Sequence, residues 1–390
     1  MIAQHQPGSG GYAHPDRQLA RSLIRGCIRC IGGWMLIISS CFAASEQPLF
    51  ESAEPLPVTL TISMSDLRDS GRSDEPFAGT LSYRDDAGAA REFDLEITLR
   101  GHSRRELCDM PPLKLNFKRS QVAGSVFANQ NKLKLVTHCR KGGQFERYLQ
   151  QEYALYGSYA ALTDNAFRVR LLDLSYVDSD GRKRDLKRAA FLIEDDGLLA
   201  ERVGFEELAT PVAATASLAP EAITLFGLFQ FMIGNTDWSL LKGRGDADCC
   251  HNGLLLRRPD DLLVIIPYDF DQAGLIDAHY ALPAEGLGIN SVRQRVFRGL
   301  CTGDAQLAAA IAHFNARQEA IKAHFPLDGS HKRANRKSRR YIDDFFEIIN
   351  DETQRQQLIE DACRGDESLW DWMKARDGAA QLSGPGQSLP

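Results

Sequence analysis

Residues 231–276 contain the motifs from which the fold and the function of this chain are predicted. They begin Phe231-Met-Ile-Gly-Asn-Thr-Asp-Trp-Ser, pass through a polar loop that contains Cys-Cys-His-Asn252, and end with Leu262-Leu-Val-Ile-Ile-Pro-Tyr-Asp-Phe-Asp-Gln-Ala-Gly274. The apolar run 222–233 leads into this stretch and is predicted to be a buried helix. The run 262–266 has the length and the β-branched composition of a buried strand.

Acidic residues follow both of these predicted buried elements. Asp237 comes where the chain must leave the helix, and Asp269 and Asp271 come directly after the strand. Asn252 lies between them in the sequence. Mg²⁺ prefers hard oxygen ligands, usually one or two carboxylates together with substrate phosphates. The stretch therefore predicts a site for a divalent metal and phosphate groups.

The order of these short motifs resembles the catalytic segment of atypical protein-kinase-like enzymes. Asn-Thr-Asp237, His-Asn252 and Tyr-Asp269-Phe are closest to the spore-coat CotH kinase family and more remotely similar to HipA-type kinases. Upstream, Leu-Arg-Gly-His-Ser-Arg at residues 99–104 resembles the Arg-Gly-Asn-Ser signature of CotH-like proteins. The likeness covers roughly residues 57–280.

The resemblance implies a role for each of these residues. Asp237 would be the general base that accepts or orients the proton of an attacking hydroxyl. Asn252 and Asp269 would bind the metal, with Asp271 as a second-tier candidate. Ordinary kinases separate the base from the asparagine by about five residues. Here the separation is larger, and an insertion at residues 242–250 would explain it.

Structural alternatives stand beside these roles. Asp237 also suits a turn that ends a helix, and Asp269 a turn that ends a strand. A calcium-binding loop beginning at Asp269 is excluded because its fifth position is Ala273 and its twelfth is Tyr280 rather than Glu. Zinc at Cys249, Cys250 and His251 is disfavoured because adjacent ligands lack the spacing that lets side chains converge on one ion.

Lys134 and Glu152 resemble the lysine and glutamate that position nucleotide phosphates in protein kinases. Lys134 lies on a predicted strand, and Glu152 lies in the predicted helix 145–162 that follows. Lys114 is the competing strand lysine. The alternative is that these side chains are solvated charges on amphipathic elements. No Gly-x-Gly-x-x-Gly precedes Lys134, which departs from ordinary protein kinases. The absence of a Gly-x-x-x-x-Gly-Lys-[Ser/Thr] motif excludes a P-loop nucleotide site.

Composition and length are those of a globular protein. The chain has 390 residues, of which 43% are hydrophobic and 25% charged, and a formal net charge of −6. This length is enough for a large two-lobed domain. No basic surface is indicated, so nucleic acid is not an expected partner.

The N-terminus reads as an export signal. Four arginines between residues 17 and 29 precede the apolar run 31–41 and small residues. Residues 1–44 are therefore predicted to be a signal peptide or a lipoprotein leader, in which Cys41 would be lipidated and anchor the protein to a membrane. Export to the periplasm agrees with six further cysteines, of which Cys108 and Cys139 are the best predicted disulfide pair.

Strand-like and helix-like segments divide the remaining chain. Alternating apolar residues predict about five antiparallel strands from residue 56 to residue 136, and an Asp-Gly turn predicts a hairpin over 167–194. Helical patterns follow at 291–300, 304–325 and 337–349. The predicted fold is α+β, two-lobed and protein-kinase-like, with a β-rich N-lobe at 55–197 and a mostly helical C-lobe at 198–375 that contains the catalytic segment 231–276. Residues 376–390 are predicted to be disordered.

The predicted function is that of an exported CotH-like kinase. It would transfer a phosphoryl group from ATP to a hydroxyl on an unknown protein or small molecule, with Mg²⁺ or Mn²⁺. Two alternatives stay open. One is a catalytically silent kinase-like binding or structural module of the cell envelope, and the other is a hydrolase that uses Asp237 and Asp269.

Overall fold

The structure is a computed structural model, which describes residues 47–73, 75–101, 103–208, 217–240, 249–329 and 331–365. These residues belong to one compact unit. The predicted leader at 1–44, including Cys41, and the predicted tail at 376–390 lie outside the described residues. So does most of the loop at 242–250.

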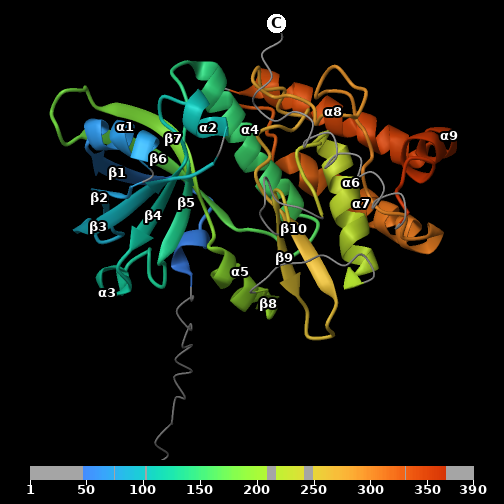
Figure 1. The fold of residues 1–390 in the computed structure, drawn as a ribbon, viewed down its shortest axis with the longest axis horizontal. Coiled ribbons are helices and arrows are strands. Elements are labelled where there is room, and N and C mark those ends of the chain that lie inside the picture. The colour runs from blue at the N-terminus through green and yellow to red at the C-terminus, as the bar shows by residue number, and fades with distance from the viewer. Residues whose placement is uncertain are drawn as a thin grey trace, which may run out of the picture. The chain divides into compact units, whose positions relative to one another are not determined.

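Seven strands form a closed barrel in the order β1-β2-β3-β4-β5-β7-β6 (Figure 1). They are β1 (Leu56–Ile62), β2 (Phe77–Arg84), β3 (Ala90–Leu99), β4 (Leu113–Phe117), β5 (Lys132–Val136), β6 (Val169–Asp178) and β7 (Leu186–Ile193). Side chains alternate between the interior and the outside along these strands, and Leu60, Ile97 and Leu115 are fully buried. The predicted strands and the β6–β7 hairpin are therefore present.

The predicted two-lobed, protein-kinase-like architecture is wrong, because the N-terminal strands form a closed barrel. The barrel closes because β1 pairs in parallel with β6, with Val58 beside Leu174, and because β5 pairs with β7. These pairings join segments that are far apart in the sequence. The period-two pattern is the same in an open sheet and in a closed barrel, so it could not reveal the closure.

The other elements are mostly helical. The helices are α1 (Met64–Ser73), α2 (Ser103–Leu107), α3 (Arg119–Val122), α4 (Gly143–Ala160), α5 (Asp196–Val203), α6 (Pro220–Ile233), α7 (Asp304–Ala323), α8 (Lys332–Asn350) and α9 (Glu352–Arg355), with short turns η1 (Pro48–Phe50) and η3 (Gln356–Glu360). A second sheet has the order β10-β9-β8, with β8 (Glu206–Glu207), β9 (Gly253–Arg257) and β10 (Leu263–Pro267).

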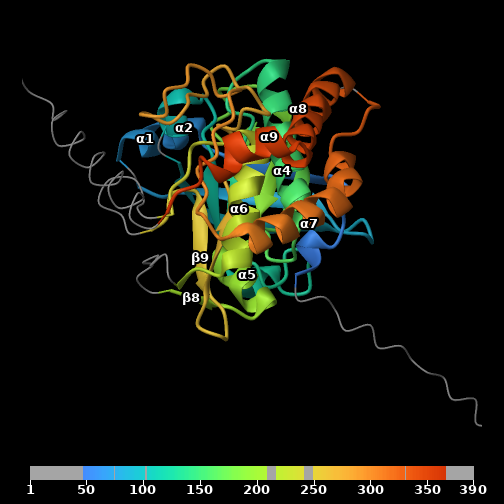
Figure 2. The same ribbon diagram turned by 90° about the vertical axis from the view of Figure 1, so that its right-hand side faces the viewer.

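Helix α4 joins the barrel to the helical part of the molecule. It contacts β6 and β7 on one side and α7 on another, and Figure 1 shows it between the strands and helices α6 to α8, which face the viewer in Figure 2. Most of its side chains are buried, including Leu149, Leu155 and Tyr156. Because α4 is covered on more than one face, its Glu152 is placed in the interior.

Four of the predicted elements in the second half are present, and one is not. Helices α6, α7 and α8 and strand β10 match the predicted segments closely. Residues 291–300 were predicted to be a helix, and this is wrong. The arginines in this segment bind main-chain carbonyl groups elsewhere, with Arg295 donating to Met232 and Arg298 to Trp238. These long-range hydrogen bonds hold the segment in a non-helical path.

Three cysteine pairs lie at disulfide distance. Cys108 and Cys139 have an S–S distance of 2.07 Å, which confirms the predicted pairing. The other pairs are Cys301 with Cys363 and the neighbours Cys249 and Cys250. Such pairs are compatible with an oxidising compartment.

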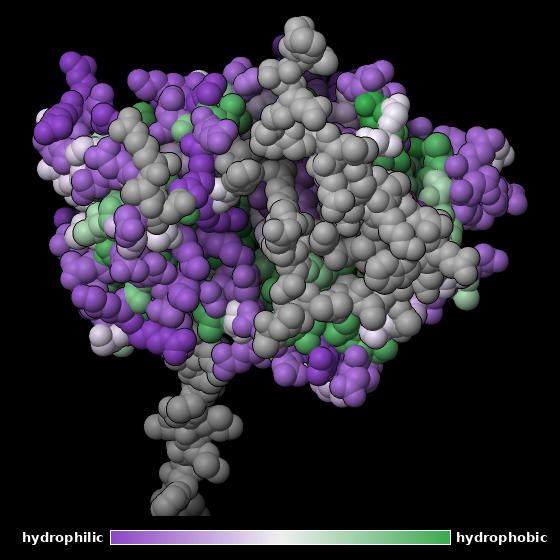
Figure 3. All heavy atoms as spheres, viewed as in Figure 1, coloured by the Kyte–Doolittle hydropathy of each residue, from purple (hydrophilic) through white to green (hydrophobic). Residues whose placement is uncertain are grey.

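Within the described ranges, no helix combines the length and the apolar character needed to span a bilayer. In the view of Figure 3, hydrophilic side chains cover much of the barrel. Leu282, Leu327 and Leu358 are the large apolar side chains that stand exposed on the described surface.

Candidate functional site

The loop after β10 turns two carboxylates toward the same point. Asp269 adopts a left-handed backbone with φ of 60°, and its N–H donates a hydrogen bond to the Tyr156 hydroxyl at 3.0 Å. Phe270 is fully buried, with its ring centroid 4.8 Å from that of Tyr156. Because Phe270 anchors the loop in the core, Asp269 and Asp271 on either side of it are held in fixed positions.

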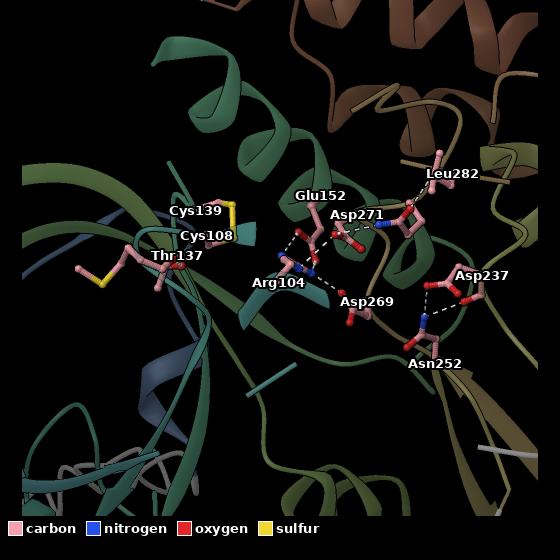
Figure 4. A network of polar contacts seen from close by, with 12 residues as sticks. Arg104, Cys108, Thr137, Cys139, Glu152, Asp237, Asn252, Asp269, Asp271 and Leu282 are labelled. Atoms are coloured by element: carbon pink, nitrogen blue, oxygen red, sulfur yellow. Dashed lines mark hydrogen bonds and ion pairs between the residues drawn. A yellow bond between two sulfur atoms is a disulfide. The ribbon is translucent and has the colours of Figure 1, made fainter. Parts of the chain in front are cut away.

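Arg104 is the centre on which these carboxylates converge (Figure 4). It lies in the short helix α2, which follows Gly101 with its left-handed φ of 78°. Its two Nη atoms each donate to one carboxylate oxygen of Glu152 at 3.3 Å, and its Nε lies 3.1 Å from Asp271 Oδ2. Its Nη2 also donates to Asp269 Oδ1. The planar guanidinium fork presents enough N–H groups to serve three carboxylates at once.

The charges in this cluster do not balance, because one guanidinium faces three carboxylates. Burial alone would lower the pKa of Arg104, but the three carboxylates raise it well above its ordinary value. Burial raises the pKa of Glu152, and Arg104 offsets this only in part. Burial also raises the pKa of Asp271, to about 7. Burial acts the same way on Asp269, but Arg104 and Arg100 outweigh it and hold that pKa below its usual value.

The raised pKa of Asp271 should make stability depend on pH. Its folded-state pKa of about 7 exceeds the ordinary value of 3.8, so the folded chain binds more protons than the unfolded chain between these values. Stability should therefore fall as pH rises from about 4 to 7. We expect the free energy of unfolding to be larger at pH 5 than at pH 8, with a contribution on the order of 2–4 kcal/mol that Asp271→Asn removes.

Urea unfolding of both proteins at the two pH values measures this contribution. Asp260→Asn is the matched control, because the Asp260 side chain is about half exposed, at 49%. It should leave the pH dependence as it is in the unchanged chain. An Asp271→Asn variant with the same pH dependence as the unchanged chain would contradict the assignment.

A second polar group is built around Asp237, at the turn that ends α6. The Asp237 N–H donates to Asn235 Oδ1 at 3.0 Å, which fixes the turn. His251 Nε2 lies 2.9 Å from Asp237 Oδ1, and the Asn252 amide donates to Asp237 Oδ2 at 3.1 Å. Main-chain hydrogen bonds between Ser239 and His251 hold the two segments side by side. A contact to each of its two oxygens therefore holds the Asp237 carboxylate in place.

The two groups are neighbours. The charge of Asp237 acts on both Asp269 and Asp271, and Figure 4 shows Asp269 between Arg104 and the pair Asp237–Asn252. The side chains of Asp237 and Asp269 are 23% and 24% exposed, whereas Glu152 and Asp271 are almost closed off from solvent. The structure therefore brings the predicted Asp237, Asn252 and Asp269 together, and the carboxylates of Asp237 and Asp269 keep partial access to solvent.

Lys134 does not pair with Glu152 as predicted. Its Nζ lies 2.6 Å from Asp196 Oδ1 instead, because Arg104 already occupies both oxygens of Glu152. The ammonium group also lies 4.9 Å from the centroid of the Tyr268 ring. Burial lowers the pKa of Lys134, and Asp196 counteracts this. Since Tyr268 directly precedes Asp269, Lys134 still borders the carboxylate loop.

Lys114, the competing strand lysine, is on β4. Its Cα is the register partner of Lys134 on β5, so both side chains leave the same face of the barrel wall. Lys114 is half-buried. The structure places Lys134 rather than Lys114 against Tyr268 and Asp196.

Asp237, Asn252 and Asp269 are the candidate ligands for a metal that is bound together with ligand phosphates. Among the residues that the structure describes, no cluster of three or more His, Cys, Asp or Glu side chains is arranged to hold a metal ion. Asp237, Asn252 and Asp269 can supply oxygen atoms, and Mg²⁺ commonly takes one or two carboxylates and completes its shell with phosphates and water. Arg104 faces three carboxylates, and the charge of Asp237 adds to theirs at Asp269, so a divalent cation would be attracted to this position.

No protein-family model matches this chain, and comparisons with curated proteins and with solved structures also find no match. The resemblance to CotH-like kinases thus rests on the order of the motifs, and it stays a prediction. The function has to be argued from the geometry of the site.

Sequence reasoning missed several residues of the site. The sequence marks Arg104 only as the last residue of the 99–104 motif and does not predict it as the shared partner of three carboxylates. Arg100 is marked only as part of the same motif, and its charge acts on Asp269 and on Lys134. The sequence suggests His251 only as a disfavoured zinc ligand and not as a partner of Asp237. Nothing marked Asp196 as the partner of Lys134, because it is one of several acidic residues in its segment.

Proposed function

We propose that this protein is a divalent-metal-dependent phosphotransferase that moves a phosphoryl group from a nucleoside triphosphate, with ATP as the expected donor, to a hydroxyl acceptor. The observation that carries the proposal is the meeting of Asp237, Asn252 and Asp269 at one partly exposed position. These residues come from three separate segments. The carboxylates of Asp237 and Asp269 are partly exposed, whereas Glu152 and Asp271 are nearly buried. Phosphoryl transfer needs little covalent chemistry beyond such positioning and charge neutralisation.

The metal and the nucleotide would use different parts of the site. Asn252 Oδ1 and the Asp269 carboxylate would hold Mg²⁺ or Mn²⁺ together with phosphate oxygens. Bound there, the ion would neutralise charge on the phosphates. Lys134, which borders Tyr268 next to Asp269, and Arg100, whose charge acts on Asp269, would supply positive charge that suits the phosphate chain of a nucleotide.

Asp237 would act on the acceptor. Its carboxylate is held by His251 and Asn252 and is 23% exposed, so a hydroxyl could donate a hydrogen bond to it. A base fixed in this way can accept or orient the proton of the attacking hydroxyl. Arg104 would act through Asp269 by holding that carboxylate in place, and buried Glu152 would hold Arg104.

Calorimetric titration of the full chain with ATP tests the first step. We expect saturable binding with Mg²⁺ or Mn²⁺ and loss of binding when the metal is chelated. Transfer is then followed with γ-labelled ATP by the appearance of labelled acceptor or of labelled phosphate when water is the acceptor. Absence of metal-dependent ATP binding would overturn the proposal. Phosphate release from simple esters without nucleotide would point to a hydrolase instead.

A catalytically silent binding module of the cell envelope is the second candidate. It is favoured by the engagement of Lys134 with Asp196 and of Asp269 with Arg104, which leaves both groups already paired. Such a module would bind ATP and metal weakly or not at all, and it would transfer no phosphate under any metal. The same titration and labelling experiments therefore separate the two candidates.

The proposed location is the cell envelope outside the cytoplasm, either in the periplasm or attached to a membrane through a lipidated Cys41. The three cysteine pairs at disulfide distance and the N-terminal export pattern support this location. Mass spectrometry of the mature protein would detect a lipidated Cys41 or a new N-terminus after residue 43 or 44.

A further inference from the structure

A basic cavity lies where helices α4 and α8 begin. Its volume is about 370 Å³, within the range of small-ligand pockets. Five basic side chains and one acidic side chain line it: Arg147, Arg293, His331, Arg333, Lys337 and Asp277. We call it the α4–α8 cavity. It shares none of its lining residues with the Asp237–Asp269 site.

The positive charge of the α4–α8 cavity is not balanced by the described residues. Asp277 lies 3.9 Å from Arg293, which accounts for one cation. Arg147, Arg333 and Lys337 have no carboxylate partner among the residues that the structure describes. Three unpaired cations around one small cavity favour an anion of more than one charge.

Both helices add positive potential at the same place. Gly143 is the first residue of α4 and lines the cavity, and neither α4 nor α8 has a side-chain cap on its N-terminus. The first turn of α8 contains no acidic residue and instead begins with Lys332 and Arg333. Cations at a helix N-terminus are unfavourable, because the unsatisfied N–H groups there are already positive. The first turn of α4 contains Glu146, so a bound anion would relieve this repulsion mainly at the start of α8.

Gln151 gives an independent sign of a ligand. This residue lines the cavity and is 5% exposed, and its Nε2 donates to Ser338 Oγ at 2.8 Å. Its Oε1 is buried and accepts no hydrogen bond from any described residue. Buried acceptors are nearly always satisfied in native proteins. A ligand with a hydroxyl group next to its anionic group would satisfy it.

We infer that the α4–α8 cavity binds the phosphate group of a small, hydroxyl-bearing phosphate ester. The phosphate would lie among Arg147, Arg333 and Lys337 and the N–H groups that start α4. The hydroxyl would donate to Gln151 Oε1. The inference does not depend on phosphoryl transfer at Asp237 and Asp269, and either can fail without the other.

The full chain tests the inference by calorimetry at constant ionic strength. The probes are inorganic phosphate, glycerol 3-phosphate and n-propyl phosphate. We expect saturable binding of all three in the millimolar range or tighter, with glycerol 3-phosphate the strongest because it alone of the esters carries a free hydroxyl. Absence of saturable binding for every probe would overturn the site. Equal affinity for the two esters would overturn the role given to Gln151.

Matched variants on α8 distinguish specific binding in the α4–α8 cavity from general attraction of an anion to a positive surface. Arg333→Gln with Lys337→Gln removes two exposed cations that line the cavity, and it should weaken glycerol 3-phosphate binding by about tenfold or more. Arg336→Gln with Arg340→Gln removes the same charge from exposed positions of the same helix outside the cavity. It should change the affinity less than about twofold. Equal losses in the two variants would overturn the proposal.

Discussion

An Asp269→Asn variant should lose phosphoryl transfer from ATP by a factor on the order of 10³ while keeping its fold. Asparagine tolerates the left-handed backbone that Asp269 adopts, so the loop should keep its path. The amide lacks the negative charge that would bind the metal beside Asn252. Initial rates with Mg²⁺ or Mn²⁺ measure the loss, and thermal unfolding followed by circular dichroism measures the fold.

Asp277→Asn is the matched control for this experiment. Asp277 also has a left-handed backbone, with φ of 55°, and it lies farther along the same loop with an exposed side chain. Its variant should transfer phosphate at the rate of the unchanged chain. If Asp269→Asn kept full activity at saturating metal, the phosphotransferase assignment would be wrong.

Replacing Arg104 by methionine should lower the free energy of unfolding by about 3–5 kcal/mol at pH 8. The change leaves the carboxylates of Glu152, Asp269 and Asp271 without their shared partner in a mostly buried position. Methionine replaces much of the aliphatic volume, so the loss reports mainly on charge. Urea unfolding followed by tryptophan fluorescence measures it.

The loss should be smaller at pH 5 than at pH 8. Burial raises the pKa of Glu152 and of Asp271, so these groups take up protons at lower pH and then need no cation. Arg91→Met is the control, because Arg91 pairs with Asp85 at 2.9 Å with its own side chain 46% exposed. An exposed pair of this kind contributes little to stability because solvent screens it. Equal effects of the two substitutions would refute the central role of Arg104.

The sequence predicts those helices and strands that a local pattern of apolar residues encodes. Alternation along residues 93–100 and 113–117 predicts strands because one side of each must face a core, and the structure contains β3 and β4 there. The barrel could not be predicted, because closure depends on the parallel pairing of β1 with β6. Long-range hydrogen bonds likewise override the helical pattern at 291–300, where Arg295 and Arg298 bind distant carbonyl groups.

The candidate site could be predicted in part. Asp237, Asn252 and Asp269 lie at the ends of buried elements, and the structure brings them together. The pairing of Lys134 with Glu152 could not be judged from the sequence, because it depends on which cation reaches the buried carboxylate. Arg104 reaches it with both Nη atoms, and the rigid fork of a guanidinium suits a carboxylate better than the single ammonium of a lysine.

The parallel pairing of β1 with β6 also bears on how the chain is made. Strand β1 ends at Ile62, whereas its neighbour β6 extends to Asp178, so more than a hundred residues must be synthesised before the two can meet. Until then the outer edge of β1 has unpaired main-chain groups that could join another growing chain. A holding chaperone that covers this edge during synthesis or secretion should therefore raise the yield of native protein.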